Sequence, residues 1–250
     1  MRRPLIAGNW KMYKTISAGV ALAREIAEGL RPGDPEVLVF PPATALSAVA
    51  QAVKGTAVEV GGQNMHFGRE GAFTGEVSAL MLKDAGCTHV LVGHSERRHV
   101  FGEDDELVAK KTRAAVDGGL IPVVCVGETL PERESGRTLE VVERQAERAL
   151  RQLTADEVGR LAVAYEPVWA IGTGQVATPE QAQEVHAFIR RRVAATHGDP
   201  VAGSVRILYG GSVKPDNIGG LMALGDVDGV LVGGASLAAD SFLKIVRGRG

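Results

Sequence analysis

The sequence predicts an α/β protein, a single (β/α)8 TIM barrel with eight parallel strands that occupies residues 1–250 as one domain. Eight short runs that are mostly apolar recur along the chain, without an alternation of polar and apolar residues. Such uniform runs are typical of parallel strands that are buried on both faces. With 250 residues for eight strands, each unit has about 31 residues, which is the size of one βα repeat. Eight units close naturally into a barrel of about this length.

The predicted strands each run directly into glycine, proline or polar residues. In chain order they are Leu5–Gly8, Val37–Phe40, Val58–Gly61, His89–Val92, Ile121–Val126, Leu161–Ala164, Val205–Tyr209 and Val227–Val232. An open, doubly wound sheet is the alternative architecture. It is disfavoured because the first run is not followed by the G-x-G-x-x-G turn that binds dinucleotides.

Helical spacing is clearest in two of the segments between the runs. In residues 139–153 the apolar positions recur every three or four residues, which gives one apolar face. A later segment repeats this pattern and has its own start signal, with Thr178 as N-cap, Pro179 at the first helical position and Gln181 completing a capping box. Gly198 is the expected end of that helix.

The composition excludes several classes of function. Apolar residues make up 45% and charged residues 23% of the chain, as in an ordinary globular protein and unlike a disordered one. The 28 basic and 30 acidic residues nearly cancel, and aromatic residues are only 4%. A general affinity for nucleic acid or for an anionic membrane needs a basic excess, so neither partner is expected.

The two cysteines, Cys87 and Cys125, are too few for a disulfide framework or a zinc cluster, and we interpret them as free thiols in a reducing compartment. No segment approaches the roughly 18 apolar residues that span a bilayer. The basic start of the chain is not followed by the apolar region of a signal peptide. The expected location is therefore the cytoplasm.

In a parallel barrel, the residues that follow each strand converge on one rim. After the seventh and eighth runs this rim carries Gly210-Gly211-Ser212 and Gly233-Gly234. Backbone N–H groups can crowd around a phosphate only where no Cβ intrudes, and barrels often build a phosphate site from these two loops. Each glycine pair alone is consistent with a simple tight turn, but both at these positions favour a phosphate site.

Three ionisable residues are expected on the same rim: Lys11 after the first run, His94 after the fourth and Glu166 after the sixth. Each alone is consistent with a structural or solvated role. Because Asn9 and Lys11 are two residues apart, they are expected to face the same way on a strand. A carboxylate, a hydrogen-bond-donating histidine and a cation beside a phosphate site are the groups that proton abstraction next to a carbonyl requires.

The segment after Glu166 has the composition of a lid. Pro167 to Trp169 is stiff, Ala170 to Gly174 is small and apolar, and the capped helix follows. Such a segment can close as a unit over a reactive intermediate and exclude water. A static loop packed on a neighbouring subunit is the alternative.

Four motifs of this sequence resemble the triosephosphate isomerase family. They are Ala7-Gly8-Asn9-Trp10-Lys11, Gly93-His94-Ser95-Glu96-Arg97-Arg98, Tyr209-Gly210-Gly211-Ser212-Val213, and the segment from Ala164 through Glu166 to Gly174. All four occur in order and at the corresponding strands. The resemblance implies the interconversion of dihydroxyacetone phosphate and D-glyceraldehyde 3-phosphate through an enediolate, in glycolysis and gluconeogenesis.

The resemblance also implies the roles of individual residues. Glu166 would be the base that moves the proton, His94 a neutral electrophile on the substrate oxygen, and Lys11 the cation, with Asn9 orienting the substrate. The N–H groups of Gly172, Ser212, Gly233 and Gly234 would hold the phosphate. No cofactor and no metal are expected, and the other histidines show no metal-ligand spacing.

The family is generally dimeric, and its third loop inserts into the partner subunit. Here that loop spans residues 65–76, and its Met65-His66-Phe67 segment departs from the usual aromatic pattern. We expect a homodimer, with a tetramer as the alternative. Gln175 stands where a lysine is common in the family, which affects lid kinetics rather than chemistry.

Two other functions compete with isomerisation. A Schiff-base aldolase needs a lysine late in the barrel, and Lys214 follows the seventh run, although Pro215 after it indicates a helix start. A barrel that only binds a phosphorylated metabolite has no use for a base, so Glu166 argues against it.

Overall fold

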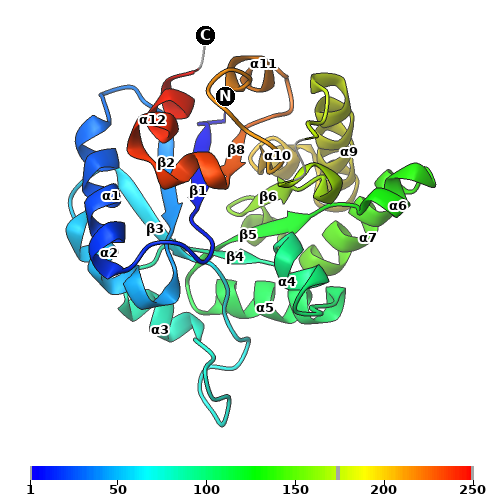
Figure 1. Ribbon diagram of the computed structural model, residues 1–250. Helices are drawn as coiled ribbons and strands as arrows, with labels where there is room; N and C mark the ends of the chain where they lie inside the picture. Colours follow the sequence, from blue (N-terminus) through cyan, green and yellow to red (C-terminus); the bar gives the residue numbers. More distant parts are fainter. Residues whose placement is uncertain (1, 173–174, 249–250) are drawn as a thin grey trace.

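The computed structural model describes residues 2–172 and 175–248, and within them eight parallel strands form a closed barrel in the order β1 to β8. Figure 1 shows the strands at the centre with the helices around them. The strands are β1 (Leu5–Asn9), β2 (Glu36–Phe40), β3 (Val58–Gly62), β4 (His89–Val92), β5 (Ile121–Val126), β6 (Ala162–Tyr165), β7 (Arg206–Tyr209) and β8 (Gly229–Val232). The predicted barrel is confirmed, and all predicted strand ends lie within two residues of the observed ones.

Each strand pairs in parallel with its neighbour, and β8 pairs with β1 to close the barrel, with Leu5 opposite Gly229 and Gly8 opposite Val232. Alternate residues point inward and form a small apolar core inside the barrel, which includes Leu38, Leu91 and Leu208. The intervening residues face outward into a larger core beneath the helices. Burial on both faces is the reason that the strands read as uniform apolar runs.

The longer helices cover the outside of the barrel. The α-helices are α1 (Ile16–Gly29), α2 (Leu46–Ala52), α3 (Ala79–Asp84), α4 (Ser95–His99), α5 (Asp105–Asp117), α6 (Leu130–Glu134), α7 (Thr138–Leu150), α8 (Ala155–Val158), α9 (Pro179–His197), α10 (Asp199–Ala202), α11 (Ile218–Met222) and α12 (Ala239–Arg247). Three short 3-10 helices are η1 (Ala43–Ala45), η2 (Val168–Ala170) and η3 (Gly234–Leu237). None of these helices, within the described part of the chain, is long and apolar enough to cross a membrane.

The two helices predicted in detail are present. Helix α9 begins after Thr178, whose side chain and that of Gln181 form the predicted capping box, and it ends at Gly198, whose φ is 89°. Helix α7 ends at Leu150, three residues before the predicted end. Leu153 is nevertheless buried, in the turn that leads into α8.

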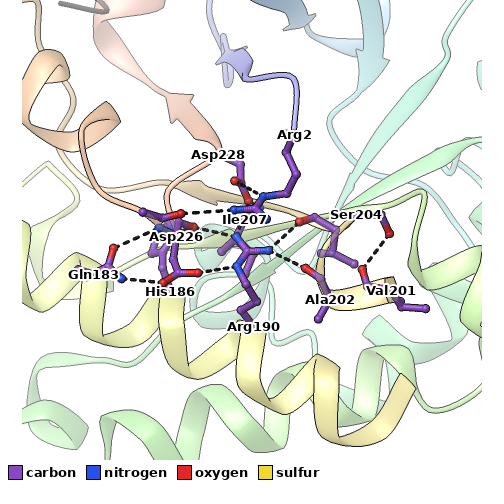
Figure 2. Close-up of polar contacts among 12 residues, drawn as sticks. Arg2, Gln183, His186, Arg190, Val201, Ala202, Ser204, Ile207, Asp226 and Asp228 are labelled. Carbon is purple, nitrogen blue, oxygen red and sulfur yellow. Dashed lines mark hydrogen bonds and ion pairs between the residues drawn. The ribbon is translucent and has the colours of Figure 1, made fainter. Parts of the chain in front are cut away.

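A network of polar side chains closes the amino-terminal end of the barrel (Figure 2). Arg190 of α9 donates to Asp226 at 2.6 Å and to Asp228 at 2.6 Å. Asp228 also pairs with Arg2 and accepts the backbone N–H of Ile207 at 2.8 Å. This network ties α9, β7, the segment before β8 and the start of the chain together, at the end of the barrel opposite to the predicted rim.

Candidate active site

A cavity of about 390 Å³ opens at the carboxyl ends of the strands. The structure brings all eight predicted site residues into its lining: Asn9, Lys11, His94, Glu166, Gly172, Ser212, Gly233 and Gly234. They follow β1, β4, β6, β7 and β8, so residues from the whole length of the chain meet at one opening. The sequence did not single out Tyr13, Ile171, Leu231 and Leu237, which also line it.

Glu166 follows β6 directly and is 2% exposed. Its Oε2 accepts the backbone N–H of Ser95 at 2.8 Å, and its Oε1 lies 3.1 Å from His94 Nε2. The Glu166 backbone N–H donates to Val126 of β5 at 2.7 Å, which extends the pairing of β5 and β6 past the end of the strand. Both the backbone and the carboxylate of Glu166 are therefore held in place at the cavity.

His94 is the N-cap of α4, which begins at Ser95. Its Nδ1 accepts the backbone N–H of Glu96 at 3.2 Å. A nitrogen that accepts a hydrogen bond carries no proton, so this contact assigns the neutral tautomer with the proton on Nε2. The N–H of His94 is therefore on Nε2, the nitrogen that lies 3.1 Å from Glu166 Oε1 at the cavity.

Lys11 reaches the cavity for a different reason from the predicted one. Strand β1 ends at Asn9, and Lys11 lies in the following turn with a φ of 50°, so the two residues do not lie on one strand. Its backbone is held by two hydrogen bonds: the N–H donates to Asn9 Oδ1 at 2.9 Å, and the carbonyl accepts Gln63 Nε2 at 2.7 Å. The left-handed backbone of a residue other than glycine is costly and is often found at functional sites.

The charge of Lys11 is paired in this structure. Its Nζ lies 2.7 Å from Glu96 Oε1. The carboxylate of Glu103 contacts Arg97 and the buried Lys111. Both glutamates, Glu96 and Glu103, thus form ion pairs.

A buried thiol lies beside Glu166. Cys125 on β5 points into the barrel interior, and burial together with the nearby charge of Glu166 raises its pKa well above the usual range. The thiol therefore stays protonated. Cys87 is also buried and unpaired, which agrees with the interpretation of two free thiols.

The predicted phosphate loops follow β7 and β8, with Gly234 at the start of η3. A Cβ on Gly234 would meet no atom within 4 Å, and one on Gly233 would meet only Lys11 Cε at 3.5 Å. The space in front of these backbone groups is open toward the cavity, beside the lysine. This is the arrangement expected for an anion held by backbone N–H groups and a nearby cation.

The predicted lid begins with Pro167, continues through η2 and reaches Gly172, while Thr173 and Gly174 lie outside the described residues. Its first part is tied to Glu128, a fully buried residue that follows β5. Glu128 accepts Trp169 Nε1 at 2.8 Å and the hydroxyl of Tyr165 at 3.2 Å. Burial and the charge of Glu128 raise the pKa of Tyr165, so its hydroxyl remains a donor.

Glu128 was missed at the level of sequence, although the signal was present. It stands two residues past the end of the fifth predicted strand, where the rim begins. Gln63, which supports Lys11, follows the third predicted strand, and the sequence indicated no role for it. Both residues act on other side chains or on the backbone, and sequence position alone does not show such contacts.

A second cluster with metal-ligand chemistry lies at the opposite end of the barrel. Donor atoms of Glu36, Glu59 and His89 all lie within 4.8 Å of one another. Spacing along the chain did not indicate it, because the three residues stand on three different strands. Glu36 pairs with Arg206 at 2.8 Å, and His89 Nδ1 lies 3.1 Å from Glu59, so both carboxylates already have a partner.

Comparison with known proteins agrees with this geometry. The family model described as "Triosephosphate isomerase" matches residues 4–249. The chain belongs to the triosephosphate isomerase family. It is 55% identical to the triosephosphate isomerase of Roseiflexus sp. (strain RS-1), over 98% of this chain and 97% of that protein. It is 52% identical to that of Caldanaerobacter subterraneus subsp. tengcongensis, over 98% and 99% of the two chains.

Among solved structures, the crystal structure of triosephosphate isomerase from Bartonella henselae superposes with a TM-score of 0.90. It is 45% identical in sequence, and the match covers 98% of each chain. As a triosephosphate isomerase, the chain interconverts dihydroxyacetone phosphate and D-glyceraldehyde 3-phosphate, which confirms the identification made from its motifs. The aldolase alternative is not supported, because a Schiff-base lysine would lie within the barrel, whereas Lys214 lies in the loop after β7. Lys214 does line the cavity. The helix start expected at Pro215 is a turn, and α11 begins only at Ile218.

Proposed function

We propose that Glu166, His94 and Lys11 perform the isomerisation, that Asn9 orients the substrate, and that backbone N–H groups hold its phosphate. The observation that supports this most directly is the contact between a carboxylate and a neutral imidazole, 3.1 Å apart, in a cavity that also contains Lys11. The phosphate-binding N–H groups are those of Gly172, Ser212, Gly233 and Gly234, all on the same cavity wall or lid.

In the proposed reaction the bound triose displaces the hydrogen bond that Glu166 accepts from the Ser95 N–H and the close contact between Glu166 and His94. The carboxylate then takes a proton from the carbon next to the carbonyl. The C–H electron pair forms the C=C bond of an enediolate, and the carbonyl oxygen gains negative charge. The N–H of His94 stabilises this oxygen and exchanges its proton between the two oxygens. Glu166 finally returns the proton to the neighbouring carbon.

Lys11 offsets the negative charge of the phosphate and of the enediolate. A unit charge pair at 4 Å in an effective dielectric of about 20 interacts by about 4 kcal/mol before desolvation is subtracted. Because Lys11 is paired with Glu96 in this structure, part of this gain is spent on separating that pair. Lys11 therefore stabilises the enediolate more than it stabilises the bound substrate, because the enediolate carries more negative charge.

The substitution Glu166→Gln tests the proposal, because it keeps the shape of the side chain and removes the base. We expect normal folding, unchanged affinity for inorganic phosphate, and a loss of at least about 10²–10⁴-fold in kcat in a coupled isomerase assay. Glu25→Gln, at an exposed position on α1, is the matched control. Full activity of the Glu166→Gln enzyme would remove this residue from its role.

We also propose that the enzyme is a homodimer. Exposed apolar side chains cluster after β1, β3 and β4: Met12, Tyr13, Ile16, Phe67, Phe73, Leu80, Met81, Val100 and Phe101. Met12 is 93% and Val100 is 73% exposed, and exposed apolar patches are typical of protein interfaces. The loop between β3 and α3 projects away from the barrel (Figure 1). Within it, the ring of His66 packs between Phe67 and Phe73, at 4.3 and 4.0 Å.

Sedimentation equilibrium tests the assembly, and it separates the dimer from a tetramer. Val100→Asp replaces one of these exposed apolar side chains by a charge and is expected to weaken the dimer, whereas Glu25→Gln leaves it intact. A monomer at all concentrations of the unmodified enzyme would contradict the proposal.

Two further expectations are part of the proposal. The unpaired buried thiols and the glycolytic substrate support a location in the cytoplasm, which fractionation of cells tests. Residues 1–250 are proposed to unfold as one domain, because the core beneath the helices involves elements from α1 to α12. Coincident urea transitions by circular dichroism and tryptophan fluorescence are expected, and two separate transitions would contradict this.

A further inference from the structure

One buried glutamine on α7 holds the chain segment that follows β5. Gln145 is 4% exposed. Its Oε1 accepts the backbone N–H of Gly127 at 2.7 Å, and its Nε2 donates to the carbonyl of the same residue at 3.2 Å. A single side-chain amide therefore satisfies both backbone polar groups of Gly127, which are buried and belong to neither a helix nor a strand.

Gly127 lies directly against the backbone of Glu166. A Cβ on Gly127 would lie 1.8 Å from the carbonyl oxygen of Glu166 and 2.6 Å from its carbonyl carbon. On either side of this contact, Glu166 N–H donates to Val126 at 2.7 Å, and Val168 N–H donates to Glu128 at 3.1 Å. Gln145, Gly127 and the backbone of Glu166 are thus stacked without space between them, so a shift of Gly127 moves Glu166.

The same segment carries the residue that binds the first part of the lid. Glu128, next to Gly127, accepts hydrogen bonds from Trp169 and Tyr165. The position of Gly127 therefore determines the position of the base on one side and of the lid contact on the other. Among the described residues, Gln145 makes no hydrogen bond to Glu166 or to residues 167–172, and it does not line the cavity.

We infer that Gln145 is a positioning residue for the isomerisation: through Gly127 it fixes the backbone of Glu166 and the lid-binding Glu128. This inference rests on the proposed role of Glu166 as the base. An apolar side chain of the same length would fill the space but would leave both polar groups of Gly127 buried without partners. The segment would then move to find other partners, and a displacement of about 1 Å at a reacting group can cost about 10²-fold in rate.

The test is Gln145→Met in the full-length enzyme, which keeps the length of the side chain and removes both hydrogen bonds. We expect kcat to fall by about 10- to 100-fold. The KM and the inhibition constant of inorganic phosphate are expected to change less than about twofold, because three of the four proposed phosphate-binding N–H groups, those of Ser212, Gly233 and Gly234, lie on the loops after β7 and β8 and not on the lid.

Gln183→Met is the matched control. Gln183 of α9 also makes two amide hydrogen bonds, to the side chain of Asp226 at 2.7 Å and to its backbone N–H at 3.2 Å, but at the amino-terminal end of the barrel (Figure 2). Its replacement is expected to lower Tm while leaving kcat within about twofold of the unmodified enzyme. This comparison separates a loss of positioning from a general loss of stability.

A second variant, Gln145→Glu, gives a rescue that depends on pH. A protonated carboxyl reproduces the amide pattern, since its O–H donates to the Gly127 carbonyl and its other oxygen accepts the N–H. The ionised carboxylate has no donor. Burial raises the pKa of such a carboxyl. The activity relative to the unmodified enzyme is therefore expected to rise as the pH falls.

Three results would overturn the inference: a folded Gln145→Met enzyme with kcat within twofold of the unmodified enzyme, an equal loss in Gln183→Met, or a flat relative pH profile for Gln145→Glu. If Gln145→Met does not fold, the pH profile of Gln145→Glu decides alone. Glu166→Gln is measured in parallel. An inactive Glu166→Gln enzyme with fully active Gln145 variants would refute only the positioning role, whereas an active Glu166→Gln enzyme would refute the proposed function itself.

Discussion

Replacing Asp228 by asparagine should destabilise the barrel strongly without touching its chemistry. Asp228 is 6% exposed and accepts hydrogen bonds from Arg190 at 2.6 Å, from Arg2, and from the backbone N–H of Ile207 at 2.8 Å. The substitution keeps the volume and one acceptor oxygen but removes the charge that two guanidinium groups share. All three partners lie at the end of the barrel opposite to the cavity (Figure 2).

The magnitude follows from these contacts. Removing one member of a buried ion pair costs about 3–5 kcal/mol, because the partner charge stays buried without compensation. Arg190 keeps Asp226 at 2.6 Å, and the asparagine oxygen can still accept the Ile207 N–H, so we expect the lower end, about 3 kcal/mol. For a chain of 250 residues this corresponds to a fall in Tm of about 6–12 °C.

Thermal unfolding followed by circular dichroism measures the effect, at one fixed protein concentration because assembly shifts Tm. Asp240→Asn is the control: Asp240 pairs with Lys244 on the surface of α12, and its side chain is 82% exposed. Its Tm should change by no more than about 2 °C. A fall of less than about 3 °C in Asp228→Asn, or a fall equal to that of the control, would refute the reasoning from buried charge. The kcat of both variants should match that of the unmodified enzyme.

Burial lowers the pKa of His186 to about 4 in the folded protein, whereas the ordinary value in an unfolded chain is about 6.5. Between these pH values the unfolded chain binds a proton that the folded protein does not bind. The free energy of unfolding should therefore fall by about 3 kcal/mol as the pH is lowered from 6.5 to 4. In urea titrations at several pH values in this range, His186→Gln should make the free energy of unfolding depend less on pH. An unchanged pH dependence would contradict the lowered pKa of His186. Gly210→Ala places a Cβ 2.9 Å from Glu166 Cγ and should lower kcat by about 10-fold or more, whereas Gly234→Ala meets no atom within 4 Å and should fold normally but raise KM. Steady-state kinetics of the two alanine variants measure these effects. A lower kcat in Gly234→Ala together with a higher KM in Gly210→Ala would contradict the prediction. Arg192→Ala removes ion pairs between the surface of α9 and two glutamates of α7, Glu143 and Glu147. Because salt screens such pairs, Tm should shift by less than about 2 °C in dilute buffer and not at all in 1 M salt. A larger shift in Tm that persists in 1 M salt would contradict this expectation.

The strands could be predicted closely because their burial on both faces leaves a direct trace in the sequence. Val37–Phe40 and Ile121–Val126 were found from composition alone, and the observed strands differ by one residue or none. Helix α9 was found with both ends because its start has a capping box and its end a glycine. Short helices such as α8 (Ala155–Val158) were not found, since four residues contain too little of the helical repeat to show it.

The candidate site could be predicted because parallel strands bring their carboxyl ends to one rim. This rule was enough to place Glu166, His94 and Lys11 at one cavity without any contact being known. It could not show the left-handed backbone of Lys11, which depends on Gln63 from another loop. Nor could it show Gln145, which lies on the outer layer and acts through two backbone groups, because the sequence does not record side-chain to backbone hydrogen bonds.

Both oxygens of Glu166 have a partner, Oε2 in a hydrogen bond from Ser95 N–H and Oε1 in the contact with His94 Nε2, and this has a consequence for how ligands compete. A small anion that fills only the pocket beside Gly233 and Gly234 leaves these contacts intact, and gains nothing from the carboxylate. A compound that also presents a hydroxyl or hydroxamate to His94 must first break them, and recovers that cost by new contacts to the same groups. Inhibitor design for this enzyme should therefore compare compounds by what they offer Glu166 and His94 in exchange, rather than by the fit of the anion alone.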